Sequence, residues 1–452
     1  MTPWPFDMDP LPVQRVALDK AHNQKGYAFF LEPGMGKTAI VMAEFTDLHD
    51  KGTVDLLVVI CPNTLRSNWE AEASKFGFKH DVVIFPDPAP TNGMWIINYE
   101  KLVTTGVEDI YNEICKRKAY VVCDESHRIK NPKAKSTKAA LALFDRAKIR
   151  RVMTGTPMAN SVVDLWPQIR AIGFHGIHKN PYTWRNRYGV MGGWMGRVVV
   201  GVQREDELKA TLDDCSFQAK KKEWMSSLPP KAYYTLGYEM TKKQRDAYRI
   251  IYKDKFLSID DQEVTAQIVI TALMKMQQIT SGFTIDDAGN VIDLVGAKNP
   301  KILAVEEALE DIEGKVILFA HYRHTIEMLH SRFGEDAVKI IGGMNRQDIE
   351  TAKAAFNTDD KVKYLIAQTA TAKEGLTLLG STKNPCHTTI FVENTYSLID
   401  RTQAEDRNHR HGQVADQVSY YDLAGSSVEA RIVKALQEKK DLVKTVMEGR
   451  DK

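Results

Sequence analysis

Short apolar runs recur along the first half of the chain, separated by stretches of helical periodicity and by loops. Runs this short, apolar on both faces and spaced by crossover lengths are typical of buried parallel strands. The runs are Tyr27–Leu31, Leu56–Cys61, Met94–Asn98, Tyr120–Cys123 and Arg151–Thr154. The pattern predicts a parallel α/β lobe in this half of the chain.

The second half repeats the pattern, so the chain reads as two lobes rather than one large sheet. Its candidate strands are Lys315–Ala320, Ala337–Ile341, Val362–Ala367, Thr388–Val392 and Val418–Leu423. The stretch between the lobes, roughly 220 to 300, carries the helical patterns Lys242–Phe256 and Val264–Ile279. We therefore predict an α/β fold of two tandem parallel-sheet lobes with a short helical insertion at their boundary, in domains 1–222, 223–300 and 301–452.

A glycine-rich loop follows the first predicted strand. The segment Glu32-Pro-Gly-Met-Gly-Lys-Thr38 stands before the helical pattern Ala39–Phe45. A strand, a glycine turn and a helix N-terminus point backbone N–H groups at a polyanion, which favours a nucleotide phosphate. In such a loop the lysine reaches the β and γ phosphates and the hydroxyl holds Mg²⁺. We expect ATP and Mg²⁺ here, held by Gly34, Met35, Gly36, Lys37 and Thr38.

Two adjacent carboxylates end another predicted strand. Tyr120–Cys123 runs directly into Asp124 and Glu125. The carboxyl ends of parallel strands share one edge of the sheet, where ligands of open α/β folds bind, so the pair should lie beside the glycine-rich loop. We expect Asp124 to bind Mg²⁺, directly or through water, and Glu125 to orient and deprotonate the attacking water.

The segment around these carboxylates resembles a known family. Asp124-Glu-Ser-His-Arg-Ile-Lys-Asn131 is similar to the second motif of the Swi/Snf-type ATPases of helicase superfamily 2, including its Arg-Ile-Lys-Asn tail. Five further segments resemble motifs of the same family in the same order, over about residues 11 to 424. They are Val58–Pro62 with Asn68 and Trp69, Thr154–Pro157, Ile317–Phe319 with Tyr322, Lys373–Leu378 and Gln403–Gln413.

The resemblance implies two RecA-like lobes and adds residues to the nucleotide site. Gln14 matches the glutamine that reads adenine, and Gly375 lies in the fifth motif. Arg407 and Arg410 match the sixth motif, and their spacing of three residues places them on one face if the segment is helical. Two guanidiniums reaching the transferring phosphoryl group would act as arginine fingers, beside Lys37 and Glu125 as the other catalytic groups.

The same motif positions imply a track for the nucleic-acid backbone. Basic, amide and hydroxyl side chains hold phosphates without reading bases, so we expect sequence-independent, salt-dependent binding. The candidates are Arg66, Asn68, Tyr99, Lys373 and Thr377. The family resemblance of Arg128–Asn131 implies duplex DNA as the substrate. Lys220–Lys222 either adds phosphate contacts or is a solvated boundary, and the sequence does not choose between them.

Composition narrows these expectations only slightly. The formal net charge is +2, and the five cysteines are an odd number without a Cys-x-x-Cys pair, which argues against a disulfide framework or a zinc ribbon. No apolar run approaches a membrane span, so we expect no membrane partner. The expected location is the cytoplasm for a prokaryotic or phage protein and the nucleus for a eukaryotic one.

Three kinds of motor fit the motifs. The leading expectation is an ATP-driven DNA translocase. The alternatives are a strand-separating or branch-migrating helicase, and a remodeller of protein–DNA complexes with a protein partner at forks or on DNA.

Overall fold

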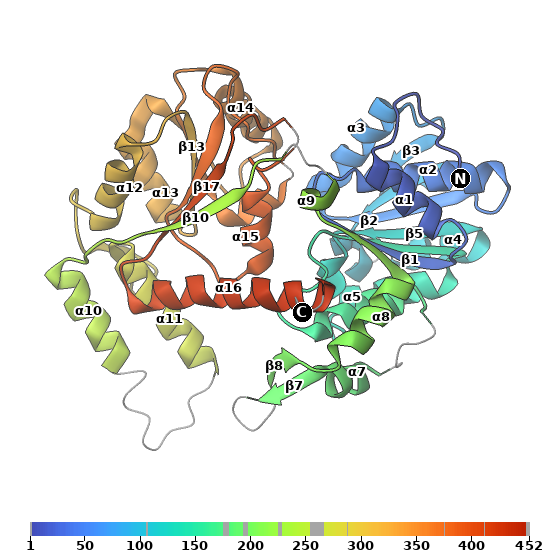
Figure 1. Ribbon diagram of the computed structural model, residues 1–452, viewed down its shortest axis with the longest axis horizontal. Helices are drawn as coiled ribbons and strands as arrows, with labels where there is room; N and C mark the ends of the chain where they lie inside the picture. Colours follow the sequence, from blue (N-terminus) through green and yellow to red (C-terminus); the bar gives the residue numbers. More distant parts are fainter. Residues whose placement is uncertain are drawn as a thin grey trace. The chain divides into compact units, whose positions relative to one another are not determined.

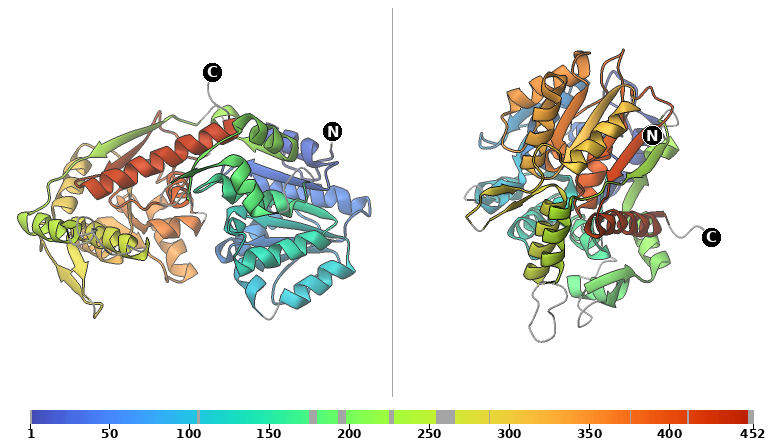
Figure 2. Two further views of the ribbon diagram at one scale, coloured as in Figure 1. Left: turned by 90° about the horizontal axis from the view of Figure 1, so that it is seen from below. Right: turned by 90° about the vertical axis from the view of Figure 1, so that its left-hand side faces the viewer.

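The computed structural model forms two compact units (Figures 1 and 2). It describes residues 2–104, 107–174, 180–192, 198–224, 228–253, 266–286, 288–374, 376–410 and 412–448. Unit 1 comprises Met1–Ser226 together with Lys439–Lys452, and unit 2 comprises Ser227–Glu438. The end of the chain thus groups with unit 1 by its contacts. The domain boundaries drawn from the sequence at 222 and 300 stay predictions.

Within its described residues, unit 1 is built on a seven-stranded parallel sheet in the order β3-β4-β2-β5-β6-β1-β9. Its strands are β1 (Gly26–Leu31), β2 (Leu56–Cys61), β3 (Asp81–Ile84), β4 (Gly93–Asn98), β5 (Ala119–Asp124), β6 (Ile149–Met153) and β9 (Ser216–Ala219). Because the sheet is parallel, β5, β6 and β1 end side by side at one edge. The residues after these three strands are therefore brought together.

Helices cover both faces of this sheet, which explains the continuous apolar strands. In β1, Tyr27 and Phe29 pack into one core while Ala28 and Phe30 pack into the other. One face is covered by α1 (Pro12–Ala21), α2 (Lys37–Asp50) and α3 (Arg66–Phe76), and the other by α4 (Val107–Lys116), α5 (Lys135–Arg146), α6 (Leu165–Ala171) and α8 (Glu205–Cys215). Three smaller elements complete this region: α7 (Pro181–Tyr188) and the hairpin of β7 (Gly189–Gly192) and β8 (Val198–Val202).

Unit 2 repeats the architecture with a six-stranded parallel sheet in its described part, in the order β10-β17-β16-β13-β15-β14. The strands are β10 (Lys231–Leu236), β13 (Lys315–Ala320), β14 (Ala337–Ile340), β15 (Tyr364–Gln368), β16 (Cys386–Phe391) and β17 (Val418–Leu423). One face is covered by α12 (Pro300–Glu310) and α13 (Arg323–Phe333), and the other by α14 (Arg346–Thr358) and α15 (Leu398–Glu405). The predicted α/β class with two parallel-sheet lobes is confirmed.

The stretch between the two sheets is less purely helical than predicted. It holds α9 (Lys221–Trp224), α10 (Lys242–Tyr252), α11 (Ala266–Thr280) and a hairpin of β11 (Phe283–Ile285) and β12 (Val291–Asp293). It also supplies β10, the edge strand of the unit 2 sheet. The last helix, α16 (Ser427–Glu448), begins in unit 2. None of the helices in the described ranges is long and apolar enough to cross a membrane.

Candidate functional site

The glycine-rich loop joins β1 to α2, as predicted. Gly34 and Gly36 have φ angles of 84° and 71°, in the left-handed region that favours glycine. A Cβ atom at Gly36 would lie 2.0 Å from Nε2 of Gln14, which donates a hydrogen bond to the Gly36 carbonyl at 3.1 Å. The Gln14 side chain therefore lies against the end of the loop, and its contact with adenine stays a prediction.

The lysine of the loop folds back onto the loop itself. Lys37 Nζ donates to the carbonyls of Leu31 at 2.8 Å and Glu32 at 3.4 Å. Met35 is fully buried and anchors the loop in the core of unit 1. Thr38 follows in the first turn of α2 and is half-buried. The backbone of the loop thus holds the ammonium group, and the contact of Lys37 with phosphates stays a prediction.

One of the three lysines 220–222 is part of this site. Lys221 is 2% exposed, and its backbone N–H donates to the Glu32 carboxylate at 2.8 Å. Its Cε lies 3.9 Å from the point where a Gly34 Cβ would be. Lys222 is exposed. Lys222 fits the solvated boundary and the buried Lys221 does not, while a phosphate contact of these lysines stays a prediction.

Asp124 ends β5 with both carboxylate oxygens engaged. Oδ2 accepts a hydrogen bond from the Trp69 indole at 3.0 Å, and Oδ1 accepts one from the Glu125 N–H at 2.9 Å. Burial, together with the adjacent Glu125 carboxylate, raises the pKa of Asp124 to about 7. A cation placed beside it would restore its charged form. The family resemblance includes Trp69 in a motif, but the hydrogen bond from its indole N–H to Asp124 is seen only in the structure.

Glu125 has an unusual backbone conformation that aims its side chain. Its φ and ψ are 50° and 52°, which is rare and strained for a residue with a Cβ. Oε2 accepts a hydrogen bond from the Thr154 hydroxyl at 3.1 Å and lies 3.3 Å from His127 Nδ1. Burial would raise the pKa of Glu125, but the hydrogen bond and charge of His127 and the charge of Lys37 outweigh it and lower the pKa to about 2. Glu125 is therefore the ionised member of the pair.

The residues after β6 connect these carboxylates to the glycine-rich loop. Thr154 Oγ1 also lies 3.1 Å from His127 Nδ1 and accepts from the Thr156 N–H at 3.1 Å. A Cβ at Gly155 would lie 2.6 Å from Cδ of Pro33, so the two segments touch. Since β6 lies between β1 and β5 in the sheet, unit 1 brings the predicted residues Lys37, Asp124 and Glu125 to one edge.

The predicted nucleic-acid positions differ in how open they are. Arg66 begins α3 half-buried, with one guanidinium N–H directed at the Phe85 carbonyl at 3.4 Å, and Asn68 is exposed in the same turn. Tyr99 is 4% exposed and donates to the Asp124 carbonyl at 2.8 Å, so it supports the carboxylate strand rather than a surface. Thr377 is half-buried. Gly375 and the side chain of Lys373 lie outside the described residues.

The two predicted arginine fingers lie in unit 2, just after α15. This helix ends at Glu405, so Arg407 and Arg410 lie in the turn that follows, and the helical segment on which a shared face depended is absent at these two residues. Their guanidiniums nevertheless converge, because both donate to the Leu376 carbonyl, at 3.2 Å and 3.3 Å. Arg407 also donates to the Gln403 carbonyl at 2.7 Å. A turn held by long-range hydrogen bonds, rather than helical periodicity, brings the pair together.

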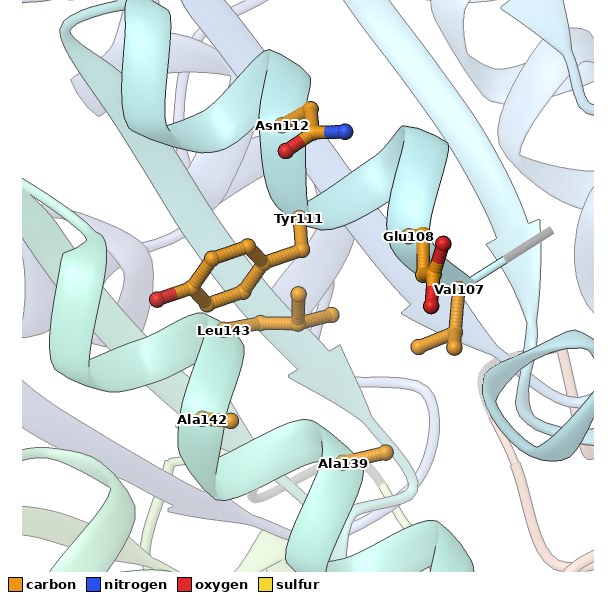
Figure 3. Close-up of a pocket in the computed structure, with 7 residues that line it drawn as sticks. All are labelled: Val107, Glu108, Tyr111, Asn112, Ala139, Ala142 and Leu143. Carbon is orange, nitrogen blue, oxygen red and sulfur yellow. The ribbon is translucent and has the colours of Figure 1, made fainter.

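A cavity of about 350 Å³ opens elsewhere in unit 1, between α4 and α5 (Figure 3). It contains no residue of the predicted site. Its lining residues are Val107, Glu108, Tyr111, Asn112, Ala139, Ala142 and Leu143.

Comparison with known proteins places this geometry in a family. The SNF2-related domain matches residues 14–282, and the helicase conserved C-terminal domain matches residues 300–412. An uncharacterized ATP-dependent helicase of Mycoplasma pneumoniae is 23% identical over 94% of this chain, and the bovine DNA annealing helicase and endonuclease ZRANB3 is 24% identical over 97% of it. The chain spans about two fifths of the length of each, 41% in both cases.

A solved structure, the SWI2/SNF2 ATPase core of Sulfolobus solfataricus in complex with dsDNA, aligns with 99% of this chain and 94% of its own, at 20% identity and a TM-score of 0.46. The family matches cover the unit 1 sheet, the unit 2 sheet except β17, and the residues after β1, β5 and β6. The chain belongs to the SNF2-related family, with the tandem ATPase and helicase C-terminal domains of a superfamily 2 helicase or translocase.

Proposed function

We propose that this chain hydrolyses ATP at the loop and carboxylates of unit 1 and uses the reaction to move along duplex DNA. The observation that carries the proposal is the convergence of Lys37, Asp124 and Glu125 at the sheet edge that bears the glycine-rich loop. The opposite pKa shifts of the two carboxylates agree with this arrangement. Titratable neighbours whose pKa values are driven apart mark a division of roles between them.

Each group has a separate task in this proposal. The ammonium of Lys37 exchanges the Leu31 carbonyl for the β and γ phosphates. Thr38 and Asp124 offer the hydroxyl and carboxylate oxygens that Mg²⁺ prefers, and when bound this ion supplies positive charge to the phosphates. Glu125, ionised and fixed through Thr154, accepts a hydrogen bond from the attacking water and orients it. Orientation matters most because phosphoryl transfer has little covalent chemistry for the protein to perform.

Arg407 and Arg410 complete the site in the proposal, which makes catalysis depend on both units. Their guanidiniums neutralise charge on the transferring phosphoryl group when the units approach. DNA that binds both units would favour that approach, so ATP and DNA affinities become coupled. The name of the bovine relative, a DNA annealing helicase, supports DNA as the polymer.

The test is the steady-state ATPase rate with matched duplex DNA, single-stranded DNA and RNA, each at two salt concentrations. Duplex should stimulate at least as well as single strands, with little dependence on sequence, and stimulation should fall steeply with salt because the contacts are to phosphates. Glu125→Gln is the matched background, since it keeps the site's shape and should bind ATP without turning it over. Stimulation by RNA alone would overturn the DNA assignment, and equal rates with every polymer and with none would favour a protein-remodelling role.

A further inference from the structure

A short connector leads into the first strand of unit 2. It contacts residues 405–410, the arginine segment, which carries Arg407 and Arg410. Residues 228–230 precede β10, whose strand lies at the edge of the unit 2 sheet. The Pro230 carbonyl accepts a hydrogen bond from the Val418 N–H at 3.0 Å, which fixes the connector to β17. The Pro229 carbonyl lies 2.9 Å from His409 Nε2. Because a carbonyl can only accept, the imidazole carries its proton on Nε2 and donates it to the connector.

Lys231, the first residue of β10, makes a second attachment to the same segment. Its ammonium lies 3.1 Å from Oε2 of Glu405 and 3.9 Å from Oδ1 of Asp406. The Tyr233 hydroxyl donates to the same Glu405 oxygen at 2.9 Å. Both carboxylates are almost fully buried, at 2% and 6% exposure, and Lys231 is 23% exposed. Burial alone would lower the pKa of Lys231, but the charge of Glu405, with Tyr420 and Asp406, raises it well above its usual range, so the ammonium stays charged.

Each of the two attachments involves the residue that directly precedes one of the two arginines. Asp406, which faces Lys231, directly precedes Arg407, and His409, which binds the connector, directly precedes Arg410. Both guanidiniums meet at the Leu376 carbonyl. A displacement of the connector would therefore act on residues next to each arginine. The Lys231 attachment is charge-assisted and its carboxylate partners are buried, and both conditions strengthen a hydrogen bond.

We propose that Lys231 and His409 are positioning residues that set Arg407 and Arg410 for catalysis, so that the connector between the units controls turnover. The inference rests on the proposed role of the arginines. It predicts an effect on the rate of hydrolysis and little effect on ATP affinity, because the glycine-rich loop belongs to the other unit. A purely structural role for the two residues would instead lower stability and affect every activity together.

The test compares Lys231→Met with Lys231→Arg, and His409→Leu with His409→Gln, in the full chain. The first member of each pair removes the attachment and the second keeps a donor. Lys298→Met is the control, since Lys298 is exposed on the same unit. DNA-stimulated kcat, KM for ATP and the melting temperature are measured for each variant. His409→Leu leaves no buried carboxylate without its cation, so it keeps the test decisive if Lys231→Met does not fold.

We expect kcat to fall about 10- to 100-fold in Lys231→Met and His409→Leu, because small misplacements of catalytic groups have effects of this size. KM should change less than about twofold, and Lys231→Arg and His409→Gln should recover most of the rate. Wild-type kcat in folded Lys231→Met and His409→Leu overturns the inference, and so does loss of rate that only parallels loss of melting temperature.

Arg407→Ala and Arg410→Ala are measured in the same assays. If both turn over ATP normally, the arginine assignment itself fails and this inference fails with it, whereas inactive arginine variants beside active Lys231 and His409 variants reject the inference alone.

Discussion

At the scale of single residues, the conformation of the glycine-rich loop depends on contacts that the motif alone does not show. The glycine-rich motif includes Gly36, and the structure shows that the Gln14 amide leaves no room for a Cβ atom at this position. For Trp69 and Thr154, the motifs do not show what the side chains contact. Their motifs identify the segments, but only the packed sheet shows that they hydrogen-bond the oxygens of Asp124 and Glu125. Contacts between residues 29 and 55 positions apart leave no local signal in one sequence.

Gly36 and Gly52 form a matched pair for testing the loop. Both have φ near 70°, at 71° and 66°, but a Cβ at Gly52 meets nothing within 4 Å. Alanine at either position should cost about 1–2 kcal/mol of stability from left-handed strain. Only Gly36→Ala should also displace Gln14 and lose ATP affinity, measured by titration with a fluorescent nucleotide. Equal ATP affinity in the two variants would show that the Gln14 contact plays no part in binding.

Trp69→Phe tests the support beneath the carboxylates. The ring keeps most of its packing, but Asp124 Oδ2 loses the hydrogen bond that the Trp69 indole donates to it. Groups that orient a metal ligand typically contribute about 10- to 100-fold in metal affinity or activity. We expect the Mg²⁺ concentration for half-maximal ATPase to rise within that range while the melting temperature changes little. An unchanged Mg²⁺ dependence would argue against Asp124 as the metal ligand.

At the scale of elements, the long buried strands and the edge strand β14 could be predicted, whereas other edge strands could not. The strands apolar on both faces, such as β2 and β5, follow from their composition. The pattern missed β3 and β10, which lie at sheet edges and are largely half-exposed or exposed, so their sequences lack a continuous apolar run. The pattern also did not show that α15 ends at Glu405, two residues before Arg407. The hydrogen bonds of both guanidiniums to the Leu376 carbonyl, which bring the pair together, leave no local signal in the sequence.

The helix behind the glycine-rich loop is fixed to the sheet by a buried ion pair. Glu44 of α2 contacts Arg151 of β6 at 2.5 Å and accepts from the Tyr120 hydroxyl of β5 at 2.7 Å, and both charged side chains have 0% exposure. Removing one partner of such a pair leaves an uncompensated buried charge. Arg151→Met should therefore lower the free energy of unfolding by about 3–5 kcal/mol.

An exposed ion pair in the same unit provides the control for this variant. Arg170 and Asp145 lie 2.8 Å apart with 29% and 45% of their side chains exposed. Arg170→Met should change stability by no more than about 1 kcal/mol, since solvent screens exposed pairs. Denaturant unfolding of both variants gives the comparison. Equal losses would mean that the fixation of α2 does not depend on the buried pair.

At the scale of the whole molecule, the order of the motifs predicted two lobes and their shared chemistry. Alternating strands and helices gave the parallel sheets, and the positions of Lys37 and Asp124 after two strands placed them at one sheet edge. The attachment of the connector to the arginine segment had no counterpart in the motifs, because Lys231 and Glu405 are 174 positions apart. Long-range ion pairs of this kind become visible only when the fold is known.

The central claim is that ATP hydrolysis moves this chain along duplex DNA, and triplex displacement tests it most directly. A third strand bound to a duplex, at a site away from where the protein loads, is released only if the protein travels to it. We expect release of the third strand to require ATP, to proceed on a fully paired duplex and to disappear in Glu125→Gln. DNA-stimulated ATP hydrolysis without any release of the third strand, or equal release by Glu125→Gln, would contradict it.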